Sequence, residues 1–422
     1  MIAKRLIEWP GVLIFTLILL GITSYGLNYQ VTKTLLHVSG LLSLVAIVSI
    51  FIKQYVNTSR GEFYPRPKPG LVVFSLLLLS AAAIVWIQTT GIDNQTSYRF
   101  SHDFITPALC AAFIALIAKS NEASFKAIQW LLPVATLSMA IPGISDYYST
   151  GQSWNRVSGS IDLPIIYASN LTALACASLL IGLTADHKAK PVLVVLCIIA
   201  FIAGLWGVTL SGSRTPALSA LLVSVAIIGV VLLKRTGVWK TLIILCLLAA
   251  SLVFASSQLL IGDRMLDAVR NIESNKQSSS IGIRFELWRG ALDGIMEEPI
   301  KGVGVGKHNE YFESKLKSDP NYIHSSARNF IHLHNDILNA TVWMGIPAAL
   351  VFLSFIAWPL IFGWLYRRTI GGALCLITSC VFIINGFSNT PSIRATSLTL
   401  FLTMTIIGAA IAYYEKEKLS AS

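Results

Sequence analysis

Charged residues are scarce in this sequence. Of its 422 residues, 13% are charged and 54% are hydrophobic, whereas an ordinary soluble domain has about a quarter charged residues. This shortage excludes a soluble enzyme. The charges lie in short clusters between long apolar blocks, which excludes a disordered or a nucleic-acid-binding chain. We therefore interpret the net charge of +11 first in terms of membrane topology.

Cysteine is also rare. The six cysteines all fall inside apolar blocks, where a thiol behaves as a small hydrophobic side chain. We expect no disulfide and no metal cluster. The first apolar stretch is too long for a cleaved signal and has no Ala-x-Ala-like end, so we expect an uncleaved first span.

Apolar blocks long enough to cross about 30 Å of hydrocarbon occur twelve times. The sequence therefore predicts an all-α polytopic membrane protein with about 12 transmembrane helices. No Asp, Glu, Lys or Arg falls inside these blocks, although ion-coupled carriers usually place such groups at membrane depth. The chemistry is expected at the helix ends or in the loops. The predicted spans are residues 11–28, 35–52, 70–88, 104–118, 127–143, 163–184, 191–210, 216–233, 241–260, 337–363, 369–386 and 395–414.

The distribution of Lys and Arg predicts the orientation. With the N-terminus inside, the short cytoplasmic segments carry 17 of these residues and the short outer loops carry 5. One large extracytoplasmic loop then lies between helices 9 and 10. We expect membrane helices 1–9 in residues 1–261, the loop in residues 262–336, and helices 10–12 with a cytoplasmic tail in residues 337–422.

The long loop shows helical periodicity. Apolar residues recur at Ile283, Leu287 and Ala291, and a second amphipathic stretch contains Tyr311 and Phe312. We expect a partly helical, folded layer on the outer membrane face.

Arg214 follows the seventh span, in the sequence Ser213-Arg214-Thr215-Pro216. Ser213 is a suitable N-cap, and Pro216 fits the first turn of the eighth helix. Because a helix N-terminus carries roughly half a positive charge, the addition of Arg214 predicts an anion site at the membrane surface. The alternative is a lone arginine that extends to lipid phosphates.

Two further arginines, Arg284 and Arg289, lie on the amphipathic helix predicted in the loop. A guanidinium group offers donors suited to phosphate oxygens, so a second arginine directed at Arg214 predicts a pyrophosphate site. The alternative for Arg289 is a surface ion pair with Glu286.

The segment His332-Leu333-His334-Asn335-Asp336 precedes the tenth span. In a helix, residues two apart diverge by about 200°, so at most one histidine is expected to face a given site; in an extended segment both point the same way. Asn335 or Asp336 is expected to cap the next helix. A neutral histidine can accept a proton from a hydroxyl group, which makes His334 a candidate general base.

Two patterns nearby have competing interpretations. The histidines suit zinc, but the further imidazoles are only His308 and His324, and no thiolate is available. The run from Gly302 to Lys307 looks like a phosphate loop. A phosphate loop needs four residues between its two glycines and a Ser or Thr directly after its Lys. The run has neither feature, so we expect a tight structural loop.

Taken in order, four motifs resemble the bacterial O-antigen ligase and polymerase superfamily. They are Arg214-x-x-x-Leu218, the Arg284 segment, Pro299 followed by the glycine-rich run, and His332-x-His334-Asn335. The resemblance covers the whole chain, and the large loop between spans nine and ten is placed as in the ligases.

The resemblance implies an enzyme of a bacterial inner membrane whose active site faces the periplasm. Arg214 and Arg284 would bind the pyrophosphate of an undecaprenyl-linked glycan, and His334 would be the catalytic residue. Some ligases carry an acidic residue near the turn before the last span, where this sequence has Asn389. The possible supporting residues are Arg289, His332, Asn335 and Arg394.

The implied reaction transfers a polysaccharide from undecaprenyl pyrophosphate to a hydroxyl group of lipid A–core, with inversion at the anomeric carbon. Two arginines and a helix end can neutralise the leaving group, so no cofactor and no metal are expected. The expected partners are the lipid-linked donor, the lipid A–core acceptor and membrane lipids, with no nucleic acid.

Three alternative functions remain. Two belong to the same superfamily, a polymerase and a protein O-oligosaccharyltransferase, and the third is a transporter of lipid-linked glycans. The charge-free spans argue against a transporter, because a polar cargo needs a hydrated path.

Overall fold

The computed structural model describes residues 17, 34–35, 37–48, 68–89, 104–114, 122–149, 157–158, 163–185, 190–236, 280–320, 322 and 332–421. Within these ranges the regular structure is helical, without a β-strand. Two short helices cover His37–Val48 and Phe104–Ile114. The labelled elements are α3 (Pro69–Thr89), α5 (Glu122–Ser149), α6 (Pro164–Thr184), α7 (Pro191–Leu210), α8 (Arg214–Thr236), α11 (Ser280–Glu297), α12 (His308–Leu316), α13 (Asp336–Leu365), α14 (Ile370–Gly386), the 3₁₀ helix η3 (Pro391–Ile393) and α15 (Ala395–Ala421).

Six helices within the described ranges are long and apolar enough to cross a membrane; they lie in α5, α6, α7, α8, α13 and α15. Four shorter apolar helices lie in α3, α14 and residues 37–48 and 104–114. Together they coincide, at least in part, with ten of the predicted spans. The predicted spans 11–28, apart from residue 17, and 241–260 lie outside the described residues. The helices of the described ranges confirm the expectation of an all-α, multi-pass membrane protein. The total of twelve membrane spans stays a prediction.

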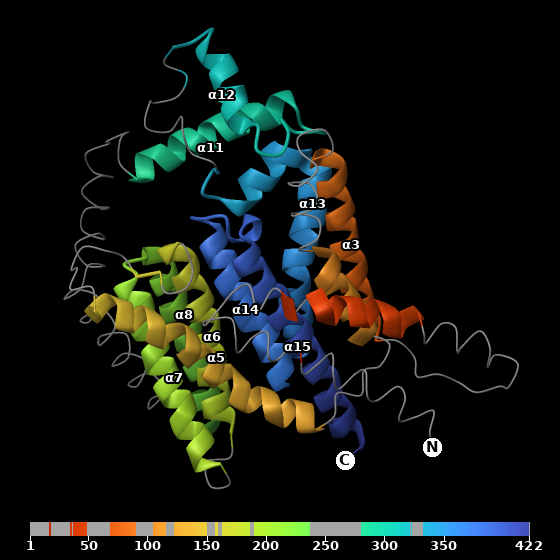
Figure 1. Cartoon of the computed structure of the whole chain (residues 1–422), viewed down its shortest axis with the longest axis vertical. Helices are drawn as coiled ribbons and strands as arrows, with labels where there is room; N and C mark the ends of the chain where they lie inside the picture. The colour runs from red at the N-terminus through yellow and green to blue at the C-terminus, as the bar shows by residue number, and fades with distance from the viewer. Residues whose placement is uncertain are drawn as a thin grey trace, which may run out of the picture.

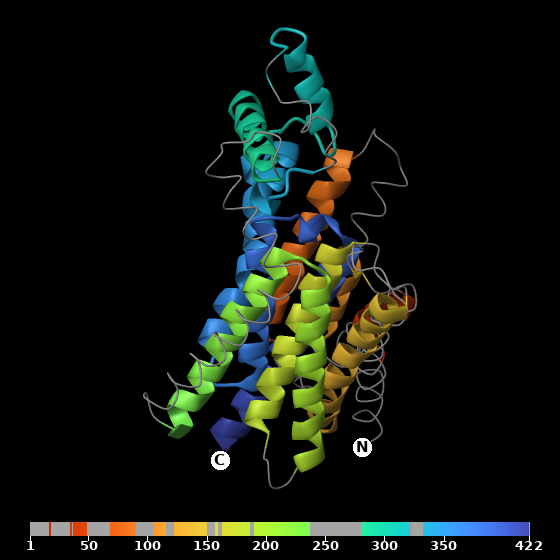
Figure 2. The ribbon, with the colours of Figure 1, turned by 90° about the vertical axis from the view of Figure 1, so that its left-hand side faces the viewer.

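The described helices form a bundle with a smaller layer at one end (Figure 1). α11 and α12 lie beyond the end of the bundle that is opposite the C-terminus, and both views agree on this (Figures 1 and 2). They are the two amphipathic stretches expected in the long loop, and their buried hydrophobic side chains include Leu287, Ala291 and Phe312. Their helical character is therefore confirmed, while the side of the membrane stays a prediction.

α6 is the central helix of the bundle. Its span is 94% buried, and it packs against α5, α7, α8 and α14. Small residues allow this close packing: a Cβ placed on Gly204 of α7 would come within 2.7 Å of the Cβ of Ala175 in α6. Thr172 of α6 donates a hydrogen bond to the carbonyl oxygen of Pro216 at 3.3 Å. The buried core of the bundle thus fixes the first turn of α8.

α13, which covers the tenth predicted span, consists of two helices joined at Gly345. The φ of 79° and ψ of 169° at this residue are accessible to glycine at little cost, and a Cβ there would overlap the carbonyl oxygen of Ile300. Residues 346–365 are long enough by themselves to cross about 30 Å of hydrocarbon. The part before the kink packs against α11, so closely that a Cβ added at Gly294 would come 3.1 Å from a methyl group of Val342. The start of α13 therefore belongs to the layer at the bundle end.

Candidate functional site

Arg214 is the first residue of α8 and lies at the bundle end next to α14. Ser213 precedes it, at the position expected for the N-cap. The Thr215 and Ser388 hydroxyl groups share a hydrogen bond of 2.5 Å. The side-chain amide of Asn385 in α14 also donates to the Ser219 hydroxyl at 3.2 Å. These contacts fix the first turns of α8, whose N-terminal dipole adds to the charge of Arg214.

α11 brings Arg284 close to Arg214. This helix is attached to the bundle end through Trp288, whose Nε1–H donates to the carbonyl oxygen of Leu333 at 2.9 Å. Burial, followed by the positive charge of Arg214, lowers the pKa of Arg284. Two guanidinium groups that repel each other are stabilised by an anion bound between them. The structure thus brings together the two arginines expected to bind pyrophosphate.

Residues 332–335 are irregular and lead directly into α13. Asn335 is the N-cap of this helix, because its Oδ1 accepts the Leu338 amide hydrogen at 3.0 Å. Leu333 is fully buried, and its amide donates to Oδ1 of Asn339 at 3.3 Å. The backbone on both sides of His334 is therefore held in place.

The two histidine rings lie side by side, with centroids 4.6 Å apart. The expectation that at most one of them faces a given site does not hold, because their segment is not helical. His334 has a φ of 53°, in the left-handed region that costs about 1–2 kcal/mol for a residue with a Cβ. Backbone strain of this kind clusters at functional sites.

Burial, together with nearby positive charges, keeps both histidines neutral. Burial lowers the pKa of His334 to about 3, with further contributions from His332, Arg284 and Arg394. Burial, then Arg394 and His308, lowers the pKa of His332 to about 4. Near pH 7 both imidazoles are therefore neutral but weakly basic, while the arginines keep the site as a whole positive.

Arg394 reaches this cluster from the turn between α14 and α15, residues 387–394. Asp336 binds the turn: its Oδ1 accepts the Ser392 hydroxyl hydrogen at 2.5 Å, and the Ser392 amide nitrogen lies 3.4 Å from both carboxylate oxygens. Sequence spacing suggested Asp336 only as a helix cap. Asp336 and Ser392 are 56 residues apart in the sequence. A local sequence pattern does not reveal such a contact, so this part of the site was not predicted.

Arg289 and His308 make contacts beside the cluster. Arg289 is 54% exposed and pairs with Glu286 at 3.2 Å, and it also donates to the carbonyl oxygen of Tyr322. Five positions after Arg284, it lies on a different face of α11. His308 is fully buried, and its Nδ1 accepts the Nε1–H of Trp343 at 2.9 Å. The surface ion pair considered for Arg289 is thus present, and its supporting role stays a prediction.

The glycine-rich run forms a tight loop, as expected. Gly302, Gly304 and Gly306 have φ values of 68°, 103° and 76°, which favour glycine. The Val303 amide donates to the carbonyl oxygen of Val342 at 2.8 Å. The loop therefore attaches the layer to the first part of α13.

No group of three His, Cys, Asp or Glu side chains within the described ranges is arranged to hold a metal ion. His324, part of the zinc alternative, lies outside the described residues. The donors that do gather, guanidinium and imidazole groups, suit an anion. Independence from metal stays a prediction.

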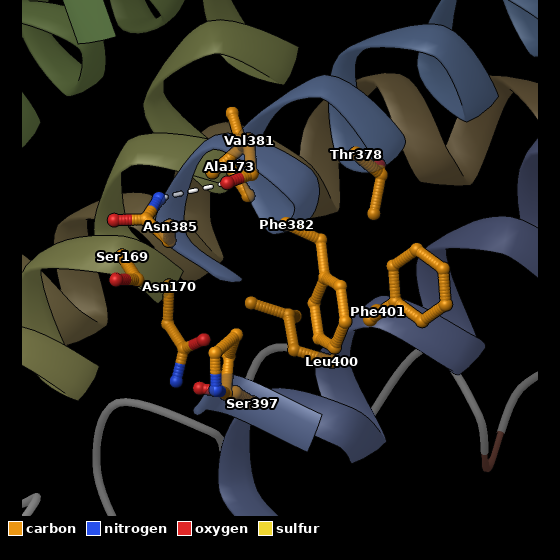
Figure 3. A pocket seen from close by; sticks show the side chains of 11 residues that line it. Ser169, Asn170, Ala173, Thr378, Val381, Phe382, Asn385, Ser397, Leu400 and Phe401 are labelled. Atoms are coloured by element: carbon orange, nitrogen blue, oxygen red, sulfur yellow. Dashed lines mark hydrogen bonds between the residues drawn. The ribbon is translucent and has the colours of Figure 1, made fainter. Parts of the chain in front are cut away.

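A pocket lies on the bundle side of the turn, between α6, α14 and α15 (Figure 3). Its walls combine Phe382 and Phe401 with polar side chains such as Asn385 and Ser397. The buried Oδ1 of Asn385 and Oγ of Ser397 have no hydrogen-bond partner among the described residues. The lining contains no charged side chain, so the anion-binding groups lie outside this pocket.

Comparisons with known proteins agree with the motifs. The family model described as O-antigen ligase matches residues 199–353, a segment that contains Arg214, Arg284 and His334. The resemblance is confirmed over this segment, and Arg394 lies outside it. A stretch of 96 residues is 31% identical to an uncharacterized protein of Haemophilus influenzae. This match covers 23% of the present chain and 24% of that protein, so the chain spans about a quarter of the length of that relative.

Proposed function

We propose that this protein is an O-antigen ligase of a bacterial inner membrane, since residues 199–353 match the family model described as O-antigen ligase. It transfers a polysaccharide from undecaprenyl pyrophosphate to a sugar hydroxyl of lipid A–core at the periplasmic face. The observation that carries the proposal is the electrostatic interaction of Arg214 with Arg284 and of Arg284 with His334. These residues come from α8, α11 and the segment before α13.

The donor pyrophosphate binds between Arg214 and Arg284. Each guanidinium group can donate two parallel hydrogen bonds to phosphate oxygens, and the N-terminal end of α8 contributes its partial positive charge. The bound anion offsets the repulsion from Arg214, which together with burial, the larger cause, lowers the pKa of Arg284. The polyprenyl chain extends along the apolar bundle, which keeps the pyrophosphate at the membrane surface.

His334 is the general base. Its imidazole accepts the proton of the acceptor hydroxyl as the acceptor oxygen attacks the anomeric carbon. The bond between that carbon and the pyrophosphate oxygen breaks, and its electron pair leaves with undecaprenyl pyrophosphate. A single displacement inverts the anomeric configuration. The bound pyrophosphate offsets the nearby positive charges and so raises the pKa of His334, which strengthens the base only when donor is present.

The leaving group needs no metal in this proposal. Arg214, Arg284 and the start of α8 stabilise the negative charge that develops on the pyrophosphate. Arg394, which lies near both histidines, adds a third guanidinium group. The three cations and the helix end supply the electrostatic stabilisation that a divalent ion supplies at other phosphate-transfer sites.

The test is transfer by the purified full-length protein in detergent, with a lipid-linked glycan as donor and lipid A–core as acceptor. We expect glycan on the acceptor and release of undecaprenyl pyrophosphate, both unaffected by EDTA and absent with His334→Ala. Detergent abolishes transport, so product formation excludes a transporter. A requirement for a divalent ion would refute the metal-independent mechanism. Product on a second lipid-linked glycan or on a protein, but not on lipid A–core, would assign a polymerase or an oligosaccharyltransferase instead.

A further inference from the structure

We propose that Asp336 is a positioning residue: through Ser392 it fixes the turn of residues 387–394 and so holds Arg394 beside the two histidines. This inference rests on the proposed function for its effect on catalysis. It concerns a contact that lies partly outside the segment matched by the ligase family, which ends at residue 353.

The contact between Asp336 and Ser392 is buried and involves the hydroxyl group and the backbone amide of the serine. Asp336 is 3% exposed and Ser392 is 7% exposed. The serine hydroxyl donates to Oδ1 at 2.5 Å, and its amide nitrogen lies 3.4 Å from each carboxylate oxygen. At Gly386 the last turn of α14 approaches the carboxylate closely, since a Cβ there would come 3.2 Å from Oδ2. A larger residue at that position would push the carboxylate away from the turn.

The same turn is attached at its other end to α8. Ser388 shares its 2.5 Å hydrogen bond with Thr215, the residue that follows Arg214. Arg394 comes two residues after Ser392, and its amide donates to the carbonyl oxygen of Pro391 at 3.2 Å. The turn is thus fixed to α8 at one end and to α13 at the other. Loss of the α13 contact removes the hydrogen bonds to Asp336 from the end that carries Arg394, and this end then keeps only the packing of η3 against α14 and α15.

The charges around the histidines come from every element that meets there. Arg214 of α8 lies near Arg284 of α11, which acts on His334. His308 of α12 acts on His332, and Arg394 acts on both histidines. Asp336 of α13 is two residues from His334. If the turn loosens, the positive charge of Arg394 moves away from the histidines. Their protonated forms are then less strongly repelled, and their pKa values rise.

The experiment measures the titration of the two histidines in the full-length protein in detergent, by NMR of ¹⁵N-labelled histidine. The signals are assigned with His332→Gln and His334→Gln. The variants are Ser392→Ala, which removes the hydroxyl, and Ser392→Thr, which keeps it. Asp336→Asn replaces the carboxyl group but keeps one oxygen acceptor, and Arg394→Ala removes the charge that the turn carries.

We expect both histidines of the original protein to stay neutral between about pH 5 and 8. Ser392→Ala should raise at least one of their pKa values by about one unit, as should Arg394→Ala, and Ser392→Thr should restore the original titration. The double variant with Ser392→Ala and Arg394→Ala should raise the histidine pKa values no further than Arg394→Ala alone. Unchanged titration in Ser392→Ala, or additive shifts in the double variant, would overturn the proposal.

The titration does not require activity, so the two proposals can fail separately. If the histidines shift as expected but no glycan is transferred, the positioning role stands and the ligase function fails. If transfer occurs but Ser392→Ala and Asp336→Asn leave both titration and the pH dependence of transfer unchanged, the positioning role fails. A general folding defect would lower transfer equally at all pH values and would not be reversed by Ser392→Thr.

Discussion

Arg214, Arg284 and Arg394 carry like charges into one region, and this costs free energy when no anion is present. Burial is the main cause of the lowered pKa values of Arg284 and of both histidines, and the repulsion from neighbouring arginines adds to it. A site of this kind gains more from a multiply charged anion than from a neutral ligand, because the anion removes the repulsion as well as forming hydrogen bonds. At the residue scale, the affinity for pyrophosphate follows from this arrangement.

Replacement of Arg214 by lysine separates charge from geometry. Arg214→Lys keeps a positive charge but loses the planar pair of donors, so transfer should fall about a hundredfold while the protein still accumulates in the membrane. Arg289→Lys is the matched control, because Arg289 is exposed and pairs with Glu286, and it should change transfer little. Equal activity of Arg214→Lys and the original protein would assign Arg214 to lipid contact.

The pH dependence of transfer should differ between the free and donor-bound protein. A base must be neutral, so activity falls as the pH drops through the pKa of His334, which is about 3 without donor. Bound pyrophosphate raises this pKa. Because kcat/KM reports the free enzyme and kcat reports the complex, the acidic limb of kcat should lie at higher pH than that of kcat/KM. Acidic limbs that coincide, or lie in the reverse order, would contradict donor activation of the base.

At the scale of elements, the kink in α13 connects the glycine-rich loop to the site. Val303, Gly304 and Ile346 donate backbone hydrogen bonds to Val342, Trp343 and Pro299 across this joint. Apolar composition predicts that a helix occupies residues 337–363, but it carries no information on where that helix bends. The bend depends on one left-handed glycine and its fit against a distant loop, which local patterns do not encode.

Two glycines with positive φ provide a matched test of the joint. Gly345→Ala should destabilise the protein by more than about 3 kcal/mol, because the new Cβ would overlap the carbonyl oxygen of Ile300. Gly306→Ala also strains the backbone but meets open space, so about 1 kcal/mol is expected. Thermal unfolding in detergent, followed with a thiol-reactive dye, measures both variants, since Cys176, Cys197 and Cys375 are fully buried. Similar losses for the two variants would mean that the joint adds no specific stability.

The helices and the candidate site were predictable to different degrees. Helix positions follow from the length of apolar blocks, and Arg214, Arg284 and His334 followed from residue chemistry and motif order. Asp336 and Ser392 did not, because a serine in a turn and an aspartate at a helix start are ordinary in sequence. Their meaning depends on α14 placing the turn against α13, which only the packed structure shows.

At the scale of the whole molecule, the arginines and histidines of the candidate site gather at one end of an apolar bundle. α6 fixes the start of α8, α8 and α13 fix the turn before α15, and α11 lies across the bundle end (Figure 1). This division suits a reaction between a lipid-linked donor, whose chain stays in the bilayer, and an acceptor that approaches from outside. It also accounts for the absence of charged residues from the predicted spans.

The most direct test of the central claim is a lipopolysaccharide gel from cells whose chromosomal copy carries His334→Ala, with His332→Ala as the comparison and membrane levels of both proteins measured. A ligase predicts loss of the whole long-chain ladder with His334→Ala, build-up of polymer on the polyprenyl carrier, and a smaller loss with His332→Ala. A ladder collapsed to core plus one repeat would show a polymerase. An unaltered ladder at normal protein levels would contradict the ligase account.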